Sequence, residues 1–258
     1  MSRAGLILAA ACAFALPAAA QQPPDSYLDH DAIQALADAV PPAPVAGSAQ
    51  DRADVEGSDR LRALENTDRW RLATRHAELR PSLALAHFDC ALGFRITAEE
   101  SPRLTSILER ILHDANEAAE LAKARAHRPR PVGADPERQA CQVVSAAGRA
   151  SPSYPSGSAT VGAAYGELIA ALVPDHAAEA SRIGHEIGVS RMVCAMHYPS
   201  DVAEGETLGK AAFQRIAATE AFQADALVAR EEIARARAAG LTSPACAAER
   251  AALATPLP

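Results

Sequence analysis

Three short segments of this 258-residue sequence hold the residue types that bind an anion and act on it. They cover residues 123–131, 155–158 and 190–201, and they lie far apart along the chain. Together they supply lysine, arginine, histidine, aspartate and small residues. Such a set can bind an anion and can present a nucleophile or a base to it.

The first segment is basic. Lys123 is followed by three arginines, and the last two, Arg128 and Arg130, alternate with prolines. Proline removes backbone donors and keeps the residue before it extended, so the run must leave any helix here. A basic run is most often a solvated face. However, only two of the 25 lysine and arginine residues are lysines, Lys123 and Lys210, which weakens the interpretation of this run as an ordinary solvated face.

The second segment is Ser156-Gly157-Ser158, which precedes an apolar stretch. Backbone N–H groups at the start of a helix bind anions without any positive side chain, and glycine permits close approach. The alternative interpretation is a proline-serine turn that only caps the helix. On this segment alone, the alternative is at least as well supported.

The third segment pairs a histidine with a carboxylate. His197 and Asp201 are four residues apart across Pro199, so we expect them to bracket the start of a helix that Asp201 caps. A carboxylate there can hold one imidazole nitrogen and leave the other free as a nucleophile or base. Arg191 can enter the same site from the preceding helix. A single histidine is more often structural, but a histidine with an orienting carboxylate and an arginine nearby is a candidate for a functional site.

Predicted helices flank these segments. The clearest runs from residue 102 to about 125, with Ser101 as N-cap, proline at the first helical position and an apolar stripe at helical spacing. A nearly uncharged apolar stretch at 159–173 predicts a helix central to the core. The other helices are expected at about 31–39, 51–74, 176–194, 201–218 and 221–239.

No stretch shows sustained alternation of apolar and polar residues, and aromatic residues make up only 4% of the chain. Both observations favour an all-α fold. We predict one helical domain over residues 51–258. An extended arm at 21–50 precedes it, because its proline pairs cannot lie inside a helix.

The first 20 residues are typical of a secretory signal peptide cleaved near Ala20: they contain Arg3, an apolar run and then small residues. No later stretch approaches the roughly 18 apolar residues that a membrane span needs. We therefore expect an exported protein with no membrane span. Its net charge of −7 gives no indication of a nucleic-acid partner.

Four cysteines remain after the expected cleavage: Cys90, Cys141, Cys194 and Cys246. An even number in an oxidising compartment predicts two disulfides, with three possible pairings. Buried free thiols are the alternative. Among the pairings we favour Cys90–Cys141 with Cys194–Cys246.

Taken together, the three segments resemble the signature of the bacterial class A non-specific acid phosphatases. These belong to the superfamily of type 2 phosphatidic acid phosphatases and vanadium-dependent haloperoxidases. The signature has the form K-x6-RP, PSGH and SR-x5-H-x3-D. The first and third parts match at every spaced position, and the second matches except at Ser158. The similarity extends from near residue 25 to about 235 and implies that superfamily's helical bundle.

The resemblance implies a periplasmic acid phosphatase that acts on small phosphate monoesters and needs neither a metal nor another cofactor. Because relatives often associate, it also implies a homo-oligomer. His197 would attack phosphorus to form a phosphohistidine, and Asp201 would orient and charge-stabilise its ring. The residues implied to hold the phosphoryl oxygens are Lys123, Arg130, Ser156, Gly157 and Arg191.

Ser158 stands where the family has the histidine that protonates the leaving alkoxide. A serine hydroxyl is too weak an acid for this, and loss of a general acid typically costs about 10²–10⁴-fold in rate. His127 and His185 are the nearest substitutes in sequence, but neither occupies the motif position and both are expected on the surface. A weakened phosphatase is the first hypothesis, and a pseudoenzyme that binds phosphate without turnover is the second. A haloperoxidase is less supported, since that chemistry also uses the missing histidine.

Overall fold

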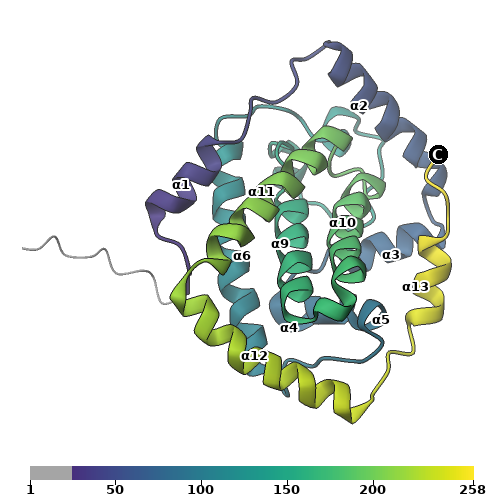
Figure 1. Ribbon diagram of the computed structural model, residues 1–258. Helices are drawn as coiled ribbons and strands as arrows, with labels where there is room; N and C mark the ends of the chain where they lie inside the picture. The colour runs from purple at the N-terminus through teal and green to yellow at the C-terminus, as the bar shows by residue number, and fades with distance from the viewer. Residues whose placement is uncertain (1–24) are drawn as a thin grey trace, which may run out of the picture.

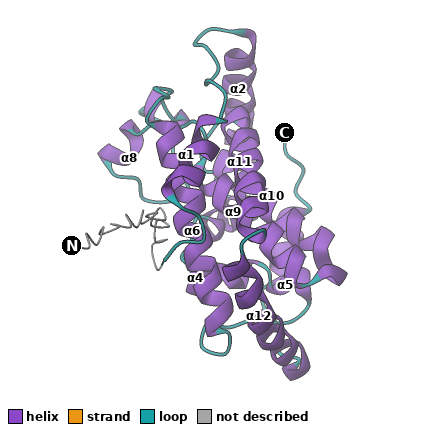
Figure 2. Cartoon of the chain, turned by 60° about the vertical axis from the view of Figure 1, so that its left-hand side comes forward, coloured by secondary structure: helices purple, strands orange, loops and turns teal. Residues whose placement is uncertain are grey.

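The computed structural model describes residues 25–258, and every regular element in this range is a helix (Figure 2). The all-α prediction is therefore confirmed. The expected signal peptide at residues 1–20 lies outside the described residues.

Helix α9 (Gly157–Leu172) lies at the centre of the molecule, with α10 (Ala177–Val193), α11 (Pro199–Ala217) and α6 (Pro102–Lys123) packed around it (Figure 1). Most of its side chains are buried, as the apolar stretch at 159–173 predicted. Within the described range, no helix is both long enough and apolar enough to cross a membrane.

Glycines allow these central helices to approach one another closely. A Cβ at Gly184 of α10 would lie 2.7 Å from the carbonyl oxygen of Gly162 in α9. A Cβ at Gly209 of α11 would lie 2.1 Å from the carbonyl oxygen of Thr160. Real Cβ atoms do not approach so closely, so backbone meets backbone along α9. This contact sets how α10 and α11 present their ends to the start of α9.

The remaining helices form an outer layer around this centre. In Figure 1, α12 (Glu220–Ala239) crosses one end of the molecule, while α1 (His30–Asp38) packs on α6. Helices α3 (Asp68–His76) and α13 (Cys246–Leu253) pack against each other near α10. The short elements are α4 (Pro81–Ala84), η2 (Leu85–His87), α5 (Asp89–Leu92), α7 (Pro131–Ala134), α8 (Ala146–Ala150) and η3 (Pro174–His176).

The N-terminal arm is bound into this body at its start. Asp114 of α6 is fully buried and accepts hydrogen bonds from the Ser26 hydroxyl and from the amides of Tyr27 and Leu28. After α1, the chain crosses the surface without helix until α2 (Ala49–Arg60) begins. The arm thus delivers α2 to the outer side of α11.

One helix was predicted across 51–74, and this prediction is wrong. The chain forms α2, then the 3₁₀ turn η1 (Leu61–Leu64), and α3 begins only at Asp68. Asn66 adopts a left-handed conformation with φ of 64°, and the Thr67 side chain then accepts the Trp70 amide as an N-cap. Asparagine tolerates this conformation better than most residues, so the break has a local cause.

Ser101 is the N-cap residue of α6 and Pro102 is its first residue, as predicted, but another side chain binds the first amides of the helix. The Ser101 side chain makes no capping bond; instead the carboxylate of Glu232, on α12, accepts the amides of Arg103 at 3.0 Å and Leu104 at 2.9 Å. A carboxylate at a helix N-terminus satisfies free amides and complements the helix dipole. Glu232 is buried, so this contact ties α12 to the start of α6.

The favoured disulfide pairing is wrong as well. The structure joins Cys90 to Cys246 and Cys141 to Cys194. The first bond ties α13 to α5, and the second ties the segment before α8 to the end of α10. Sequence spacing could not select this pairing, because helix packing decides which cysteines meet.

We predict that Glu232→Ala lowers the free energy of unfolding by about 1–3 kcal/mol, because two buried amides of α6 lose their acceptor. Urea unfolding followed by circular dichroism measures the change. Glu231→Ala is the matched control, since Glu231 is the exposed neighbour on the same helix. Equal losses in both variants would contradict the capping role.

Candidate active site

The three predicted segments meet where α6 ends, α9 begins and the chain passes from α10 to α11. A Cβ built on Gly157 would lie 3.1 Å from Lys123 Nζ, so the end of α6 faces the start of α9. The Ser156 amide donates to the Asp201 carbonyl oxygen at 2.9 Å, which joins the second segment to the third.

His197 lies at the centre of this group and is 2% exposed. Its Nδ1 is 2.7 Å from the carbonyl oxygen of Ser153, which can only accept, so Nδ1 carries the proton. Its Nε2 then accepts a hydrogen bond from Arg130 Nη1 at 2.8 Å. Asp201, which was expected to orient the ring, lies within ion-pair distance of the same nitrogen, with its Oδ2 3.8 Å from Nδ1. The backbone carbonyl therefore sets the tautomer, and Nε2 is the unprotonated nitrogen, whose lone pair Arg130 contacts.

The electrostatics keep this histidine neutral. Burial lowers the pKa of His197 to about 3; Asp201 opposes this shift, while the neighbouring Arg130 and Arg191 add to it. An unprotonated imidazole is the nucleophilic form. The site thus holds an uncharged nucleophile among cations.

Three cations of the site are each less than 9% exposed: Lys123, Arg130 and Arg191. Burial lowers the pKa of all three, that of Arg191 to about 10. Among the described residues, Lys123 alone of the three has a carboxylate partner, Glu120 at 2.5 Å. Arg130 Nε donates to the Ser151 hydroxyl, and Arg191 Nη1 donates to the Gln142 side-chain oxygen at 3.0 Å. The positive charge is therefore incompletely balanced, which suits an anion.

The start of α9 adds donors to these cations. Ser156 is the N-cap, and its hydroxyl oxygen accepts the Ala159 amide at 3.2 Å, so its own proton can be donated elsewhere. Gly157 leaves room for the Lys123 ammonium. Ser158 follows in the first turn, partly exposed, and its hydroxyl has no hydrogen-bond partner within residues 25–258.

The prediction that Asp201 caps α11 is confirmed, and Asp201 does so from the first turn of the helix. The helix begins at Pro199, and Asp201 Oδ2 accepts the Tyr198 amide at 2.7 Å. Burial raises the pKa of Asp201, but His197, Arg128 and the Tyr198 amide outweigh this effect, and the net shift is downward. Asp201 is therefore a buried, ionised carboxylate.

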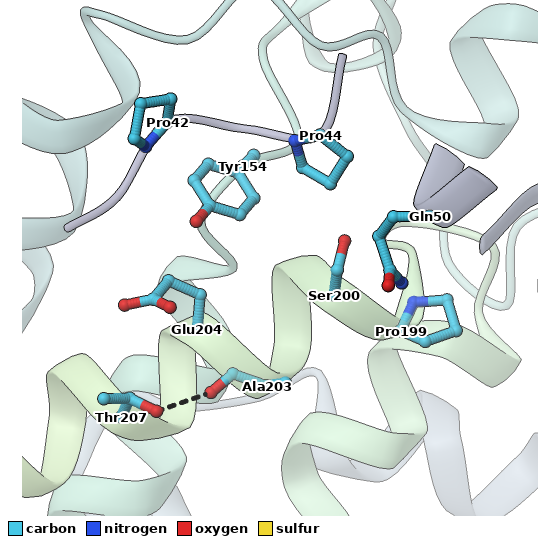
Figure 3. A pocket seen from close by; sticks show the side chains of 9 residues that line it. All are labelled: Pro42, Pro44, Gln50, Tyr154, Pro199, Ser200, Ala203, Glu204 and Thr207. Atoms are coloured by element: carbon cyan, nitrogen blue, oxygen red, sulfur yellow. Dashed lines mark hydrogen bonds between the residues drawn. The ribbon is translucent and has the colours of Figure 1, made fainter. Parts of the chain in front are cut away.

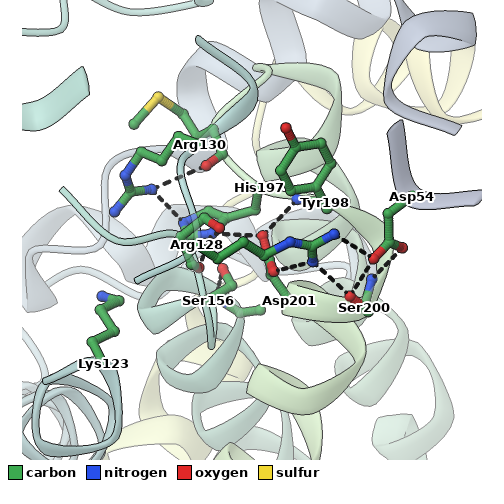
Figure 4. A network of polar contacts seen from close by, with 12 residues as sticks. Asp54, Lys123, Arg128, Arg130, Ser156, His197, Tyr198, Ser200 and Asp201 are labelled. Atoms are coloured by element: carbon green, nitrogen blue, oxygen red, sulfur yellow. Dashed lines mark hydrogen bonds and ion pairs between the residues drawn. The ribbon is translucent and has the colours of Figure 1, made fainter. Parts of the chain in front are cut away.

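Arg128 is a residue that the sequence analysis missed. Its Nη1 donates to Asp201 Oδ1 at 2.8 Å, and its Nη2 donates to Asp54 of α2 at 2.7 Å (Figure 4). The alternating prolines around Arg128 and Arg130 were the available signal. The prolines keep both arginines extended. Arg128 then binds Asp201, and Arg130 binds His197.

The two suggested substitute acids lie on the surface. His127 is exposed, and His185 is exposed and bonded to Glu206 at 2.8 Å. Neither makes a hydrogen bond to a residue of the predicted site among the described residues. The described chain also has no cluster of three or more histidine, cysteine, aspartate or glutamate residues that could hold a metal ion.

An open pocket of about 530 Å³ lies between the arm and α11 (Figure 3). Pro42 and Pro44 form one wall, and Tyr154, Ser200 and Glu204 are on the other. None of the eight predicted site residues lines it. The pocket is therefore distinct from the predicted phosphate-binding group.

A neutral histidine beside buried cations at a helix start forms a site suited to an anion. Residues 106–220 match the PAP2 superfamily. An acid phosphatase of Zymomonas mobilis subsp. mobilis is 31% identical over 202 residues, which cover 78% of this chain and 76% of that protein.

Two further relatives are non-specific acid phosphatases. That of Providencia stuartii is 29% identical over 219 residues, 82% of this chain and 86% of the relative. That of Salmonella typhimurium is 29% identical over 199 residues, 75% of this chain and 78% of the relative. The chain belongs to the PAP2 superfamily, among relatives named acid phosphatases.

We predict that His197 stays neutral as the Nδ1–H tautomer until the pH falls to about 3, because burial and two arginines disfavour its charged form. Nitrogen-15 NMR titration measures this, with His197→Asn to assign the signal. Added inorganic phosphate should raise the midpoint, since a nearby anion favours the imidazolium. His185 is the internal contrast, because Glu206 raises its pKa. A midpoint near 6.5 for His197 would overturn the prediction.

Proposed function

We propose that this protein is an acid phosphatase that hydrolyses small phosphate monoesters through a phosphohistidine on His197. The observation that carries the proposal is the orientation of His197. Its Nδ1 proton is held by the Ser153 carbonyl, and its Nε2 lone pair points to Arg130. Membership in a superfamily of phosphatases supports the same reaction.

In the proposed first step, the phosphoryl oxygens take over the donors of Arg130 and Arg191, helped by Lys123 and the amide of Gly157. The Nε2–P bond forms as the bond from phosphorus to the ester oxygen breaks, and Asp201 stabilises the imidazolium that results. In the second step, water attacks phosphorus, the N–P bond breaks and phosphate leaves. Positioning and neutralisation of the oxygens provide most of the catalysis.

Ser158 makes the first step sensitive to the leaving group. Because its hydroxyl cannot serve as an acid near neutral pH, the departing alkoxide must take its proton from solvent. Aryl phosphates need little protonation, since their oxygens are weakly basic. The enzyme should therefore favour them over sugar phosphates.

The direct test compares p-nitrophenyl phosphate with glucose 6-phosphate across pH 4–8. We expect turnover of the aryl ester that His197→Ala abolishes. His30→Ala is the control, because His30 is an exposed residue of α1. Absence of His197-dependent turnover on both substrates would falsify the proposal.

The alternative is a pseudoenzyme that binds phosphate without turnover. The loss of the family's acid at Ser158, beside retained phosphate ligands, is the observation that favours it. Calorimetric binding of inorganic phosphate by a protein without turnover would support this alternative. Absence of both binding and turnover would exclude both functions.

Restoring the acid gives a second prediction. In Ser158→His, we expect kcat/KM for glucose 6-phosphate to rise by up to about 10²–10⁴-fold, with a smaller gain on the aryl ester. The variant should also lose activity above about pH 6.5, where the new histidine deprotonates. The unchanged protein has no group at position 158 that titrates there. An equal gain on both substrates, without the new pH limb, would contradict the role given to this position.

Localisation and assembly are also proposals. The expected signal peptide and the bacterial relatives support export to the periplasm. A homo-oligomer stays a prediction from the resemblance.

A further inference from the structure

We propose that Asp54 and Arg128 form a positioning chain that connects the N-terminal helix α2 to the Asp201–His197 pair. The inference rests on the proposed function. It goes beyond that function by making α2, which lies outside the three motif segments, part of the catalytic apparatus. Figure 4 shows the chain of contacts from Asp54 through Arg128 to Asp201.

Arg128 is the centre of this chain. Both of its terminal nitrogens are used: Nη1 binds Asp201 at 2.8 Å and the Ser200 hydroxyl at 2.8 Å, while Nη2 binds Asp54 at 2.7 Å and Asp51 at 3.0 Å. Its guanidinium carbon lies 4.3 Å above the centre of the Tyr198 ring. A planar fork with fixed donor directions can bridge two carboxylates in one geometry, which a lysine cannot.

Asp54 holds Arg128 from one side and the start of α11 from the other. Its Oδ1 accepts the Ser200 amide at 3.1 Å, and its Oδ2 accepts the Ser200 hydroxyl at 2.5 Å. Ser200 directly precedes Asp201 in the first turn of α11. Asp54 therefore fixes both the cation that binds Asp201 and the backbone that carries it.

Burial makes this chain different from a surface ion pair. The side chains of Asp54 and Asp201 are at most 1% exposed, and that of Arg128 is 5% exposed. A buried charge that loses its partner is strongly destabilised and seeks another. Without Arg128, the cations nearest to Asp201 would be those that surround His197. Arg128 takes up Asp201 at 2.8 Å, and among the described residues Asp201 makes no direct ion pair with Arg130 or Lys123.

The closing experiment is a double-mutant cycle on the full chain. We expect Asp54→Asn and Arg128→Gln each to lower kcat on p-nitrophenyl phosphate by about 10–100-fold, as outer partners of catalytic groups do. The binding constant for inorganic phosphate should change by less than about threefold, because neither residue is a proposed phosphate ligand. The kcat of the double variant should be no lower than that of the more impaired single variant, since both residues act through Asp201.

Asp59→Asn is the matched control. Asp59 lies on the same helix and pairs with Arg62 and Arg138, outside this network. We expect its kcat to stay within about twofold of the unchanged protein. Unchanged kcat in Asp54→Asn, or losses that add in the double variant, would overturn the proposal. If Asp54→Asn fails to fold, Ser200→Ala removes the hydroxyl shared by Asp54 and Arg128 and should lower kcat in the same way.

The NMR signal of His197 separates this inference from the proposed function. If the protein has no turnover, the phosphatase proposal fails while the positioning chain is still testable. Asp54→Asn should then shift the nitrogen resonances of His197 or the midpoint of its titration, and Asp59→Asn should not. Identical His197 spectra in the unchanged protein and in Asp54→Asn would overturn the positioning chain, whatever the activity.

Discussion

Burying three cations beside one imidazole has a large solvation cost, and the site depends on how the fold offsets it. Arg130 repels both Lys123 and Arg191, and within residues 25–258 Lys123 alone of the three has a carboxylate partner. Neutral acceptors hold the two arginines. This arrangement leaves a net positive field at Nε2 of His197. Burial lowers the pKa of that histidine most, and Arg130 and Arg191 add to the shift, so cations that suit an anion also help to keep the nucleophile unprotonated.

The central helices make this concentration of charge possible. The three cations come from different segments: Lys123 ends α6, Arg130 precedes α7 and Arg191 lies in α10. Helix α9 packs against both α6 and α10. Glycines at the contacts of α9 with α10 and α11 let backbones touch, so the start of α9 lies deep among the ends of its neighbours. Larger residues at these positions would separate the helices and disperse the cations.

A second arginine, Arg128, pairs with the carboxylate of Asp201. Arg128 and Arg130 are two residues apart, yet Arg128 binds Asp201 and Arg130 binds His197. A buried carboxylate beside uncompensated cations would otherwise pair with them and close the site. The chemistry at Ser158 is a separate matter: it concerns protonation of the leaving group and leaves this charge arrangement unchanged.

The sequence by itself determined the helical class, the core role of the apolar stretch at 159–173 and the three motif segments, because period, proline position and residue type are local properties. It also indicated which positions carry cations and a nucleophile. It failed at the break near Asn66 and at the disulfides, and it did not reveal that Glu232, rather than the Ser101 side chain, binds the first amides of α6. Each of these depends on a local choice or a partner that spacing does not reveal.

Only the tertiary structure decided which hydrogen-bond and ion-pair partner each polar group has. The Ser153 carbonyl, rather than Asp201, sets the tautomer of His197, and Asp54 reaches the site through Arg128. Glu232 caps a helix that begins 130 residues before it in the sequence. These contacts join residues that are distant in the chain, and helix packing brings them together. Burial then makes each contact matter, because a polar group removed from water must be satisfied by whatever the fold places beside it.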